Sequence, residues 1–138
     1  MLGPKLKYSC GYWPDSATTL EESEVHMLDM YCERAGIVDG MNVIDLGCGW
    51  GSVTLHVAQK FPRCTVTGIS NSNSQREYIL ATAKQRGLKN VNVLTGDITA
   101  FDLPKKEFYG KYGCRIDSII KLFDFLMFFS YVFFLLFF

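Results

Sequence analysis

The chain has 138 residues, and its 14 basic residues are balanced by 14 acidic ones. This length suits one domain with one core. Because the charges cancel, no net field draws the chain to nucleic acid or to an anionic membrane, and we expect a small-molecule partner. The five cysteines include no Cys-x-x-Cys pair. This pattern argues against a disulfide framework or a zinc knuckle and favours a cytoplasmic location, and no signal peptide is evident.

The first predicted element is a helix that begins near Thr18 or Thr19 and ends at Gly36. Each threonine is followed three residues later by an acid, Glu21 or Glu22, which is the spacing of a capping box. Apolar side chains then recur at helical intervals, at Val25, Leu28, Cys32 and Ala35.

Strands and helices alternate after this helix. The predicted order is strand 42–46, helix 51–61, strand 64–69, a helix from 72–74 to 86, and strand 91–95. Such alternation predicts parallel strands with right-handed crossovers and a ligand crevice at their carboxyl ends. The expected fold class is therefore α/β.

Segment 45–51, Asp-Leu-Gly-Cys-Gly-Trp-Gly, directly follows the first strand. Glycines let the backbone turn tightly and approach a ligand, while the N–H groups at the start of the next helix face it. A dinucleotide fingerprint has another glycine spacing and carries its acid about 20 residues later. The acid two residues before Gly47 therefore favours S-adenosylmethionine over NAD.

Polar residues also follow the second and third strands. Asn71 and Gln75 are placed to hydrogen-bond to ribose hydroxyls, while Asp97 can accept from an adenine amine with Ile98 against the ring. Each feature alone is also typical of an ordinary cap or turn. Their occurrence at the end of each strand, along one sheet edge, favours binding.

Residues 1–18 form a predicted arm that contains Leu-Lys-Tyr-Ser-Cys-Gly-Tyr-Trp at 6–13. The arm can fold over a ligand, with Ser9 donating to a carboxylate, or it can pack on the sheet edge as a hydrophobic segment. His26 and His56 fall within helical patterns, and we expect surface or packing roles for both.

These motifs together resemble the cyclopropane-fatty-acid-synthase-like methyltransferases, particularly the plant coclaurine N-methyltransferase branch. The resemblance rests on Tyr-Ser-Cys-Gly-Tyr-Trp at 8–13, Tyr-Cys-Glu-Arg at 31–34, the glycine segment, Thr-Gly-Ile-Ser-Asn-Ser at 67–72 and Asp-Ile at 97–98. It covers about 2–103 and implies a class I, Rossmann-like fold. It also implies that S-adenosylmethionine is contacted by Ser9, Gly47, Asn71, Gln75, Asp97 and Ile98.

The chain departs from the family pattern after Leu103, where the Phe-Glu-His-Met motif of the family is missing. We therefore expect a partial methyltransferase domain at 19–103 with an incomplete sheet, followed by a divergent tail at 104–138, as in a truncated product. Eight of the 11 phenylalanines lie between Phe123 and Phe138, and no charged residue follows Asp124. This last stretch is shorter than the roughly 20 residues of a membrane-spanning helix, so we do not favour membrane association. A buried segment and an aberrant terminus are the alternatives.

The expected reaction is methyl transfer to the amine of a benzylisoquinoline-type alkaloid such as coclaurine, although the sequence shows no catalytic acid or base. Cyclopropane synthesis on a lipid alkene is one alternative. A non-catalytic fragment that binds cofactor or pairs with a homologue is another.

Overall fold

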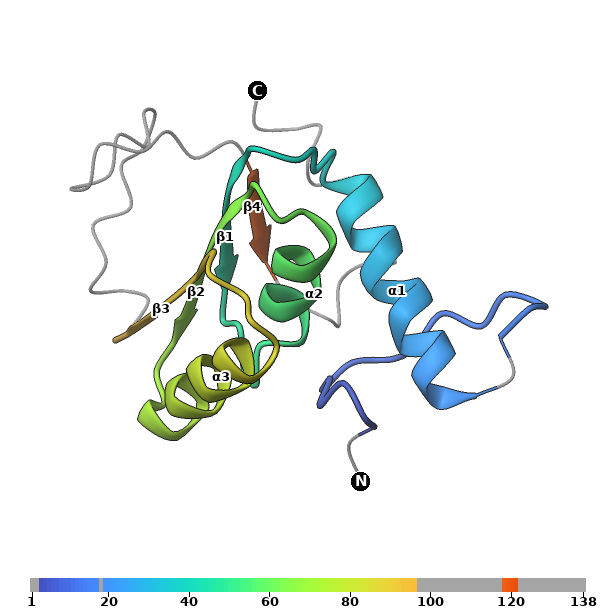
Figure 1. Cartoon of the computed structure of the whole chain (residues 1–138). Coiled ribbons are helices and arrows are strands. Elements are labelled where there is room, and N and C mark those ends of the chain that lie inside the picture. Colours follow the sequence, from blue (N-terminus) through green and yellow to red (C-terminus); the bar gives the residue numbers. More distant parts are fainter. Residues whose placement is uncertain (1–2, 18, 97–117, 122–138) are drawn as a thin grey trace, which may run out of the picture.

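The computed structural model describes residues 3–17, 19–96 and 118–121. The elements are α1 (Leu20–Arg34), β1 (Asn42–Leu46), α2 (Ser52–Lys60), β2 (Thr65–Ser70), α3 (Asn73–Gln85), β3 (Val91–Thr95) and β4 (Ser118–Lys121). The strands are parallel and lie in the order β3-β2-β1-β4 (Figure 1). The predicted α/β class is confirmed, and β4 is a strand that the sequence analysis did not predict.

The helices cover the sheet from one side. The chain moves from β1 to β2 to β3 in one direction, so right-handed connections place α2 and α3 over the same face. In Figure 1, α2 lies in front of the strands, with α1 on one side of it and α3 on the other. This arrangement leaves the carboxyl ends of β1, β2 and β3 along one edge.

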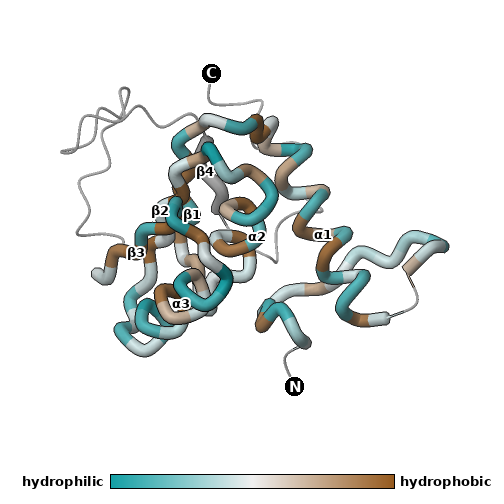
Figure 2. Tube along the Cα trace, in the orientation of Figure 1, coloured by the Kyte–Doolittle hydropathy of each residue, from teal (hydrophilic) through white to brown (hydrophobic). Residues whose placement is uncertain are grey.

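Two hydrophobic clusters hold these layers together. One lies between α1, α2, β1 and β2 and includes Leu28, Val43, Val57 and Val66. The other joins α2 to α3 and β3 through Leu55, Ile79 and Val93. Hydrophobic and hydrophilic residues alternate along α1 (Figure 2), as expected for a helix that buries one face.

The capping box of α1 forms as predicted, and it uses the second of the two threonines. The Thr19 hydroxyl accepts from the Glu22 backbone N–H at 3.2 Å, and the Glu22 carboxylate accepts from the Thr19 N–H at 2.9 Å. Both contacts satisfy N–H groups that a helix start leaves unpaired.

The start of α2 is held by a side chain from β1. Gly51, its N-cap, contributes no side-chain hydrogen bond. The fully buried Asp45 carboxylate instead accepts from the Thr54 N–H at 3.1 Å and from the Thr54 hydroxyl at 2.6 Å. Because an anion is favoured at a helix N-terminus, this contact fixes α2 to the end of β1.

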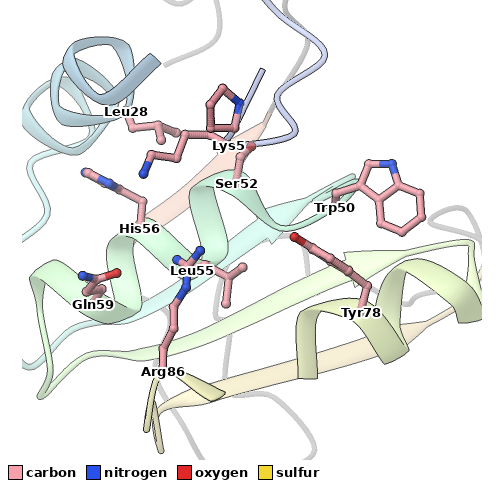
Figure 3. Close-up of a pocket in the computed structure, with 10 residues that line it drawn as sticks. Lys5, Leu28, Trp50, Ser52, Leu55, His56, Gln59, Tyr78 and Arg86 are labelled. Atoms are coloured by element: carbon pink, nitrogen blue, oxygen red, sulfur yellow. The ribbon is translucent and has the colours of Figure 1, made fainter. Parts of the chain in front are cut away.

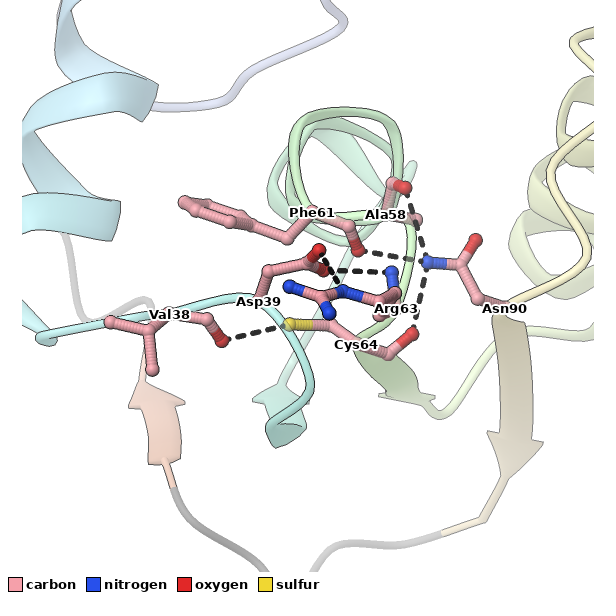
Figure 4. Close-up of polar contacts among 7 residues, drawn as sticks. All are labelled: Val38, Asp39, Ala58, Phe61, Arg63, Cys64 and Asn90. Carbon is pink, nitrogen blue, oxygen red and sulfur yellow. Dashed lines mark hydrogen bonds and ion pairs between the residues drawn. The ribbon is translucent and has the colours of Figure 1, made fainter.

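The opposite edge of the sheet is held by Asn90. Its Nδ2 group donates to the carbonyl oxygens of Ala58, Phe61 and Cys64 at 3.0–3.2 Å (Figure 4). Nearby, Arg63 Nε lies 2.6 Å from the Asp39 carboxylate. The Asn90 contacts tie the end of α2 and the start of β2 to the segment that leads into β3, and the Arg63 contact ties the start of β2 to the segment that leads into β1.

Asp29 links α1 to α2. Its Oδ1 lies 2.8 Å from His56 Nε2 and 2.6 Å from Lys60 Nζ. Burial raises the pKa of Asp29, but hydrogen bonds from Lys60 and His56 outweigh it, so the net pKa is below its usual value. Burial holds the pKa of His56 below its usual value despite the opposing effect of Asp29. His56 is therefore a packing histidine between two helices.

No helix within the described residues is long and apolar enough to cross a membrane. The phenylalanine-rich segment after residue 121 lies outside the described residues.

We predict that Thr54→Val destabilises the fold by about 1.5–3 kcal/mol, the range for a hydrogen bond to a charged group. The change keeps the side-chain shape but removes the hydroxyl from the buried Asp45 carboxylate. Urea unfolding would measure it. The matched control is Thr65→Val, at an exposed position that begins β2. Equal stability of the two variants would show that the Asp45 contact does not anchor α2.

We predict that acidification below about pH 6.5 weakens the fold through His56. A histidine whose pKa is lowered by folding stays neutral in the native state. Stability is therefore full above its unfolded pKa and is lost as the pH falls towards the native pKa. His56→Gln removes this titration, so the loss of unfolding free energy between pH 7.5 and 5.5 should become smaller. An unchanged pH dependence in urea unfolding would contradict this assignment.

Candidate cofactor-binding site

The glycine segment after β1 forms a tight turn in which its three glycines differ in role. Gly47, Gly49 and Gly51 all have positive φ, at 74°, 53° and 78°. A Cβ on Gly51 would lie 2.6 Å from Ile79 Cγ1, so this glycine lets α3 pack against the turn. A Cβ on Gly47 would meet no atom within 4 Å, because the residue faces open space. Gly47 therefore leaves room for a ligand to approach the backbone.

The turn is held against the end of β2. The N–H groups of Gly47 and Cys48 both donate to the Ile69 carbonyl oxygen, at 2.9 and 3.0 Å. A Cβ on Gly68 would lie 2.9 Å from Cys48 Sγ and 3.0 Å from Thr54 Oγ1, so only glycine fits at this position of β2. Gly68 thus lets the second strand lie close beside the turn.

Cys48 is a packing residue of this turn. Burial raises the pKa of its thiol to about 12, with a further contribution from Asp45. The thiol therefore stays protonated at neutral pH and cannot serve as a thiolate nucleophile.

The ends of β2 and β3 lie side by side at this edge of the sheet. Ser70 Oγ donates to Gln75 Oε1 at 2.6 Å, so this bond uses the amide oxygen of Gln75 and not its amide nitrogen. Asn71, the next residue after Ser70, is exposed. The Gly96 N–H donates to the Ser70 carbonyl oxygen at 3.0 Å and so brings the end of β3 to this point. Asp97 and Ile98 come next in the chain but lie outside the described residues.

The N-terminal arm contacts the glycine turn. Trp50 Nε1 donates to the Tyr8 hydroxyl at 2.5 Å, and a Cβ on Gly49 would lie 3.5 Å from the Tyr8 ring. Trp50 also meets Tyr78 of α3 edge to face, with ring centroids 5.3 Å apart. These contacts hold the arm against the glycine turn.

Ser9 follows Tyr8 and is partly buried. Its hydroxyl oxygen accepts a hydrogen bond from the Lys7 ammonium group, which also donates to the Cys10 carbonyl oxygen at 2.7 Å and to the Tyr31 hydroxyl at 3.4 Å. Just before Ser9, Lys7 thereby attaches the arm to α1, and Tyr8 attaches it to the glycine turn.

A small hollow lies on the helical side of this turn. Its lining includes Lys5 of the arm, Trp50, His56 of α2, Tyr78 within α3, and Arg86 at the end of that helix (Figure 3). Its volume is about 40 Å³, whereas pockets for drug-sized ligands have about 300–1,000 Å³. The hollow is therefore too small to be the cofactor crevice.

Sequence reasoning missed several residues of this site. It assigned no role to Lys7, Gly68 or Tyr78, whose importance depends on contacts with distant segments. Lys7 stands in the arm motif itself, and Gly68 within a β-branched run is a signal of close backbone approach. Within residues 3–17, 19–96 and 118–121, no three His, Cys, Asp or Glu side chains gather where they could hold a metal ion.

Comparisons with known proteins agree with this geometry. The family model for mycolic acid cyclopropane synthetase matches residues 1–120. Pavine N-methyltransferase of Thalictrum flavum subsp. glaucum is 56% identical over 102 residues, which make up 74% of this chain and 29% of that protein. The cyclopropane-fatty-acyl-phospholipid synthase of Escherichia coli (strain K12) is 37% identical over 97 residues, which make up 70% of this chain and 24% of that protein.

A solved structure shows the same arrangement of elements. The crystal structure of coclaurine N-methyltransferase bound to N-methylheliamine and SAH matches with a TM-score of 0.71 and 54% identity. The match covers 74% of this chain and 30% of that one. The chain thus spans less than a third of the length of these relatives.

Proposed function

Because the chain belongs to the mycolic acid cyclopropane synthetase family, we propose that its glycine turn and N-terminal arm bind S-adenosylmethionine. The observation that carries this proposal is the open space at Gly47, where no atom lies within 4 Å of a built Cβ. A turn without a side chain at this position lets the cofactor approach the backbone directly.

The polar groups around this space suit the parts of the cofactor. We infer that Asn71 and the amide nitrogen of Gln75, at the end of β2, bind the ribose hydroxyls, which both accept and donate hydrogen bonds. We infer that Ser9, in the arm, binds the carboxylate of the amino-acid end. For Asp97 and Ile98, the proposed adenine contacts rest on their position directly after β3.

We propose that the whole protein is an N-methyltransferase acting on an amine of a benzylisoquinoline-type alkaloid. The bound cofactor supplies an electrophilic methyl group on its sulfonium, so the protein needs chiefly to hold the amine in line with it and to exclude water. Tyr8 and Trp50 lie beside the glycine turn and can exclude water there. The support for an alkaloid acceptor is the 56% identity to pavine N-methyltransferase, against 37% to the bacterial cyclopropane synthase.

We further propose a cytoplasmic location. Cys10, Cys32, Cys48 and Cys64 are all free thiols in the described part of the chain, which suits a reducing compartment.

Gly47→Val should abolish binding of S-adenosylhomocysteine, because its side chain would fill the space that the cofactor needs. The matched control is Gly87→Val. Gly87 also has a positive φ, 69°, and open space around its Cβ, but it follows α3 away from the crevice. Both variants carry the same backbone strain, so calorimetry separates strain from steric exclusion. Equal affinities in the two variants would remove the support for this site.

When the chain is incubated with methyl-labelled S-adenosylmethionine, a benzylisoquinoline such as coclaurine should become labelled at its amine. An unsaturated phospholipid should not become labelled. Gly47→Val is the negative control. Label in the phospholipid would establish the cyclopropane reaction instead. Cofactor binding without transfer to either acceptor would identify this chain as a binding unit without activity of its own.

A further inference from the structure

Lys7 is a buried cation in the arm that covers the crevice. Only 4% of its surface is exposed. Because lysine is almost never fully buried unless it is paired, the partners of Lys7 are informative. Its ammonium group donates to Ser9 Oγ, to the Cys10 carbonyl oxygen and to the Tyr31 hydroxyl. It also lies 5.2 Å from the centroid of the Tyr31 ring. Two of these partners belong to the arm and one to α1.

The chemistry of this contact decides how Ser9 can act. An ammonium group has N–H donors and no acceptor, so Ser9 Oγ must be the acceptor in its bond with Lys7. The proton of the Ser9 hydroxyl then points away from Lys7, where it can be donated to another acceptor. The buried lysine thus prepares Ser9 to donate, which is the role an anionic ligand requires.

The position of Lys7 adds an electrostatic effect. Tyr8, between Lys7 and Ser9, holds this part of the arm on the glycine turn through Trp50. The positive charge therefore lies one hydrogen bond behind Ser9, in a site largely removed from water. Charges interact more strongly there than in bulk solvent.

We propose that Lys7 is a positioning residue for the carboxylate at the amino-acid end of the cofactor. It orients the Ser9 hydroxyl as a donor and places a buried positive charge behind it. This inference rests on the proposed binding of S-adenosylmethionine and specifies which part of that molecule the arm recognises.

The test compares two ligands that differ in the amino-acid end. S-adenosylhomocysteine carries the carboxylate, whereas 5′-methylthioadenosine has the same thioether and adenosine without it. For Lys7→Met in the full chain, calorimetry should show roughly tenfold weaker binding of S-adenosylhomocysteine, the lower range for a hydrogen bond to a charged group. Binding of methylthioadenosine should stay at the wild-type value, and Lys7→Arg should recover most of the lost affinity.

The matched control is Lys5→Met, which removes a cation two residues earlier in the same arm. Lys5 pairs with the exposed Glu21 carboxylate at 2.9 Å and should leave both affinities unchanged. The role of Lys7 would be overturned if Lys7→Met weakened binding of both ligands equally. It would also be overturned if the variant bound both ligands as tightly as the wild type does. Failure of wild-type protein to bind either ligand would overturn the proposed cofactor itself.

Discussion

The hydrogen bonds between the Asp45 carboxylate and Thr54 are the constraint on which the rest of the site depends. A buried charge is tolerated only where it is paired or hydrogen-bonded. The buried Asp45 carboxylate therefore requires the first turn of α2 to lie where Thr54 can donate to it. The chain between these two residues must then turn sharply, and the positive φ values of its glycines follow from that requirement. The open space at Gly47 is a consequence of how one strand and one helix are joined.

Segments from elsewhere in the chain also meet this turn. The end of β2 supplies the Ile69 carbonyl oxygen for two N–H groups of the turn, and Gly68 allows that strand to come close. The arm adds Tyr8, whose hydroxyl accepts from Trp50, while Trp50 meets the ring of Tyr78 in α3. One indole therefore connects the arm, the turn and the third helix. A change in any of these contacts therefore alters the surroundings of the glycine turn.

Local patterns in the sequence predicted most of the described fold. Strands 42–46 and 91–95 match β1 and β3, and α1 begins at one of the two predicted capping boxes, the one at Thr19. These features succeed because alternation, periodicity and caps depend on neighbours within a few residues. The strand β4 was not predicted, since it depends on pairing with β1, more than 70 residues earlier in the chain. The family resemblance was confirmed, whereas the six proposed cofactor contacts stay predictions, with Asp97 and Ile98 outside the described residues.

Lys7 illustrates why the site needs the structure as well as the motif. From its residue type alone, a lysine in an N-terminal loop is expected on the surface. Lys7 is buried because its ammonium group donates to the hydroxyl of Tyr31, which lies 24 positions further along the chain. The attachment of Tyr8 to the glycine turn also contributes to this burial. Together these contacts bend the arm back over α1 and leave the ammonium group behind Ser9. Serine is a common residue in loops, but here the Ser9 hydroxyl becomes a directed donor. Its orientation is set by the Lys7 ammonium group, whose own position is set by the fold.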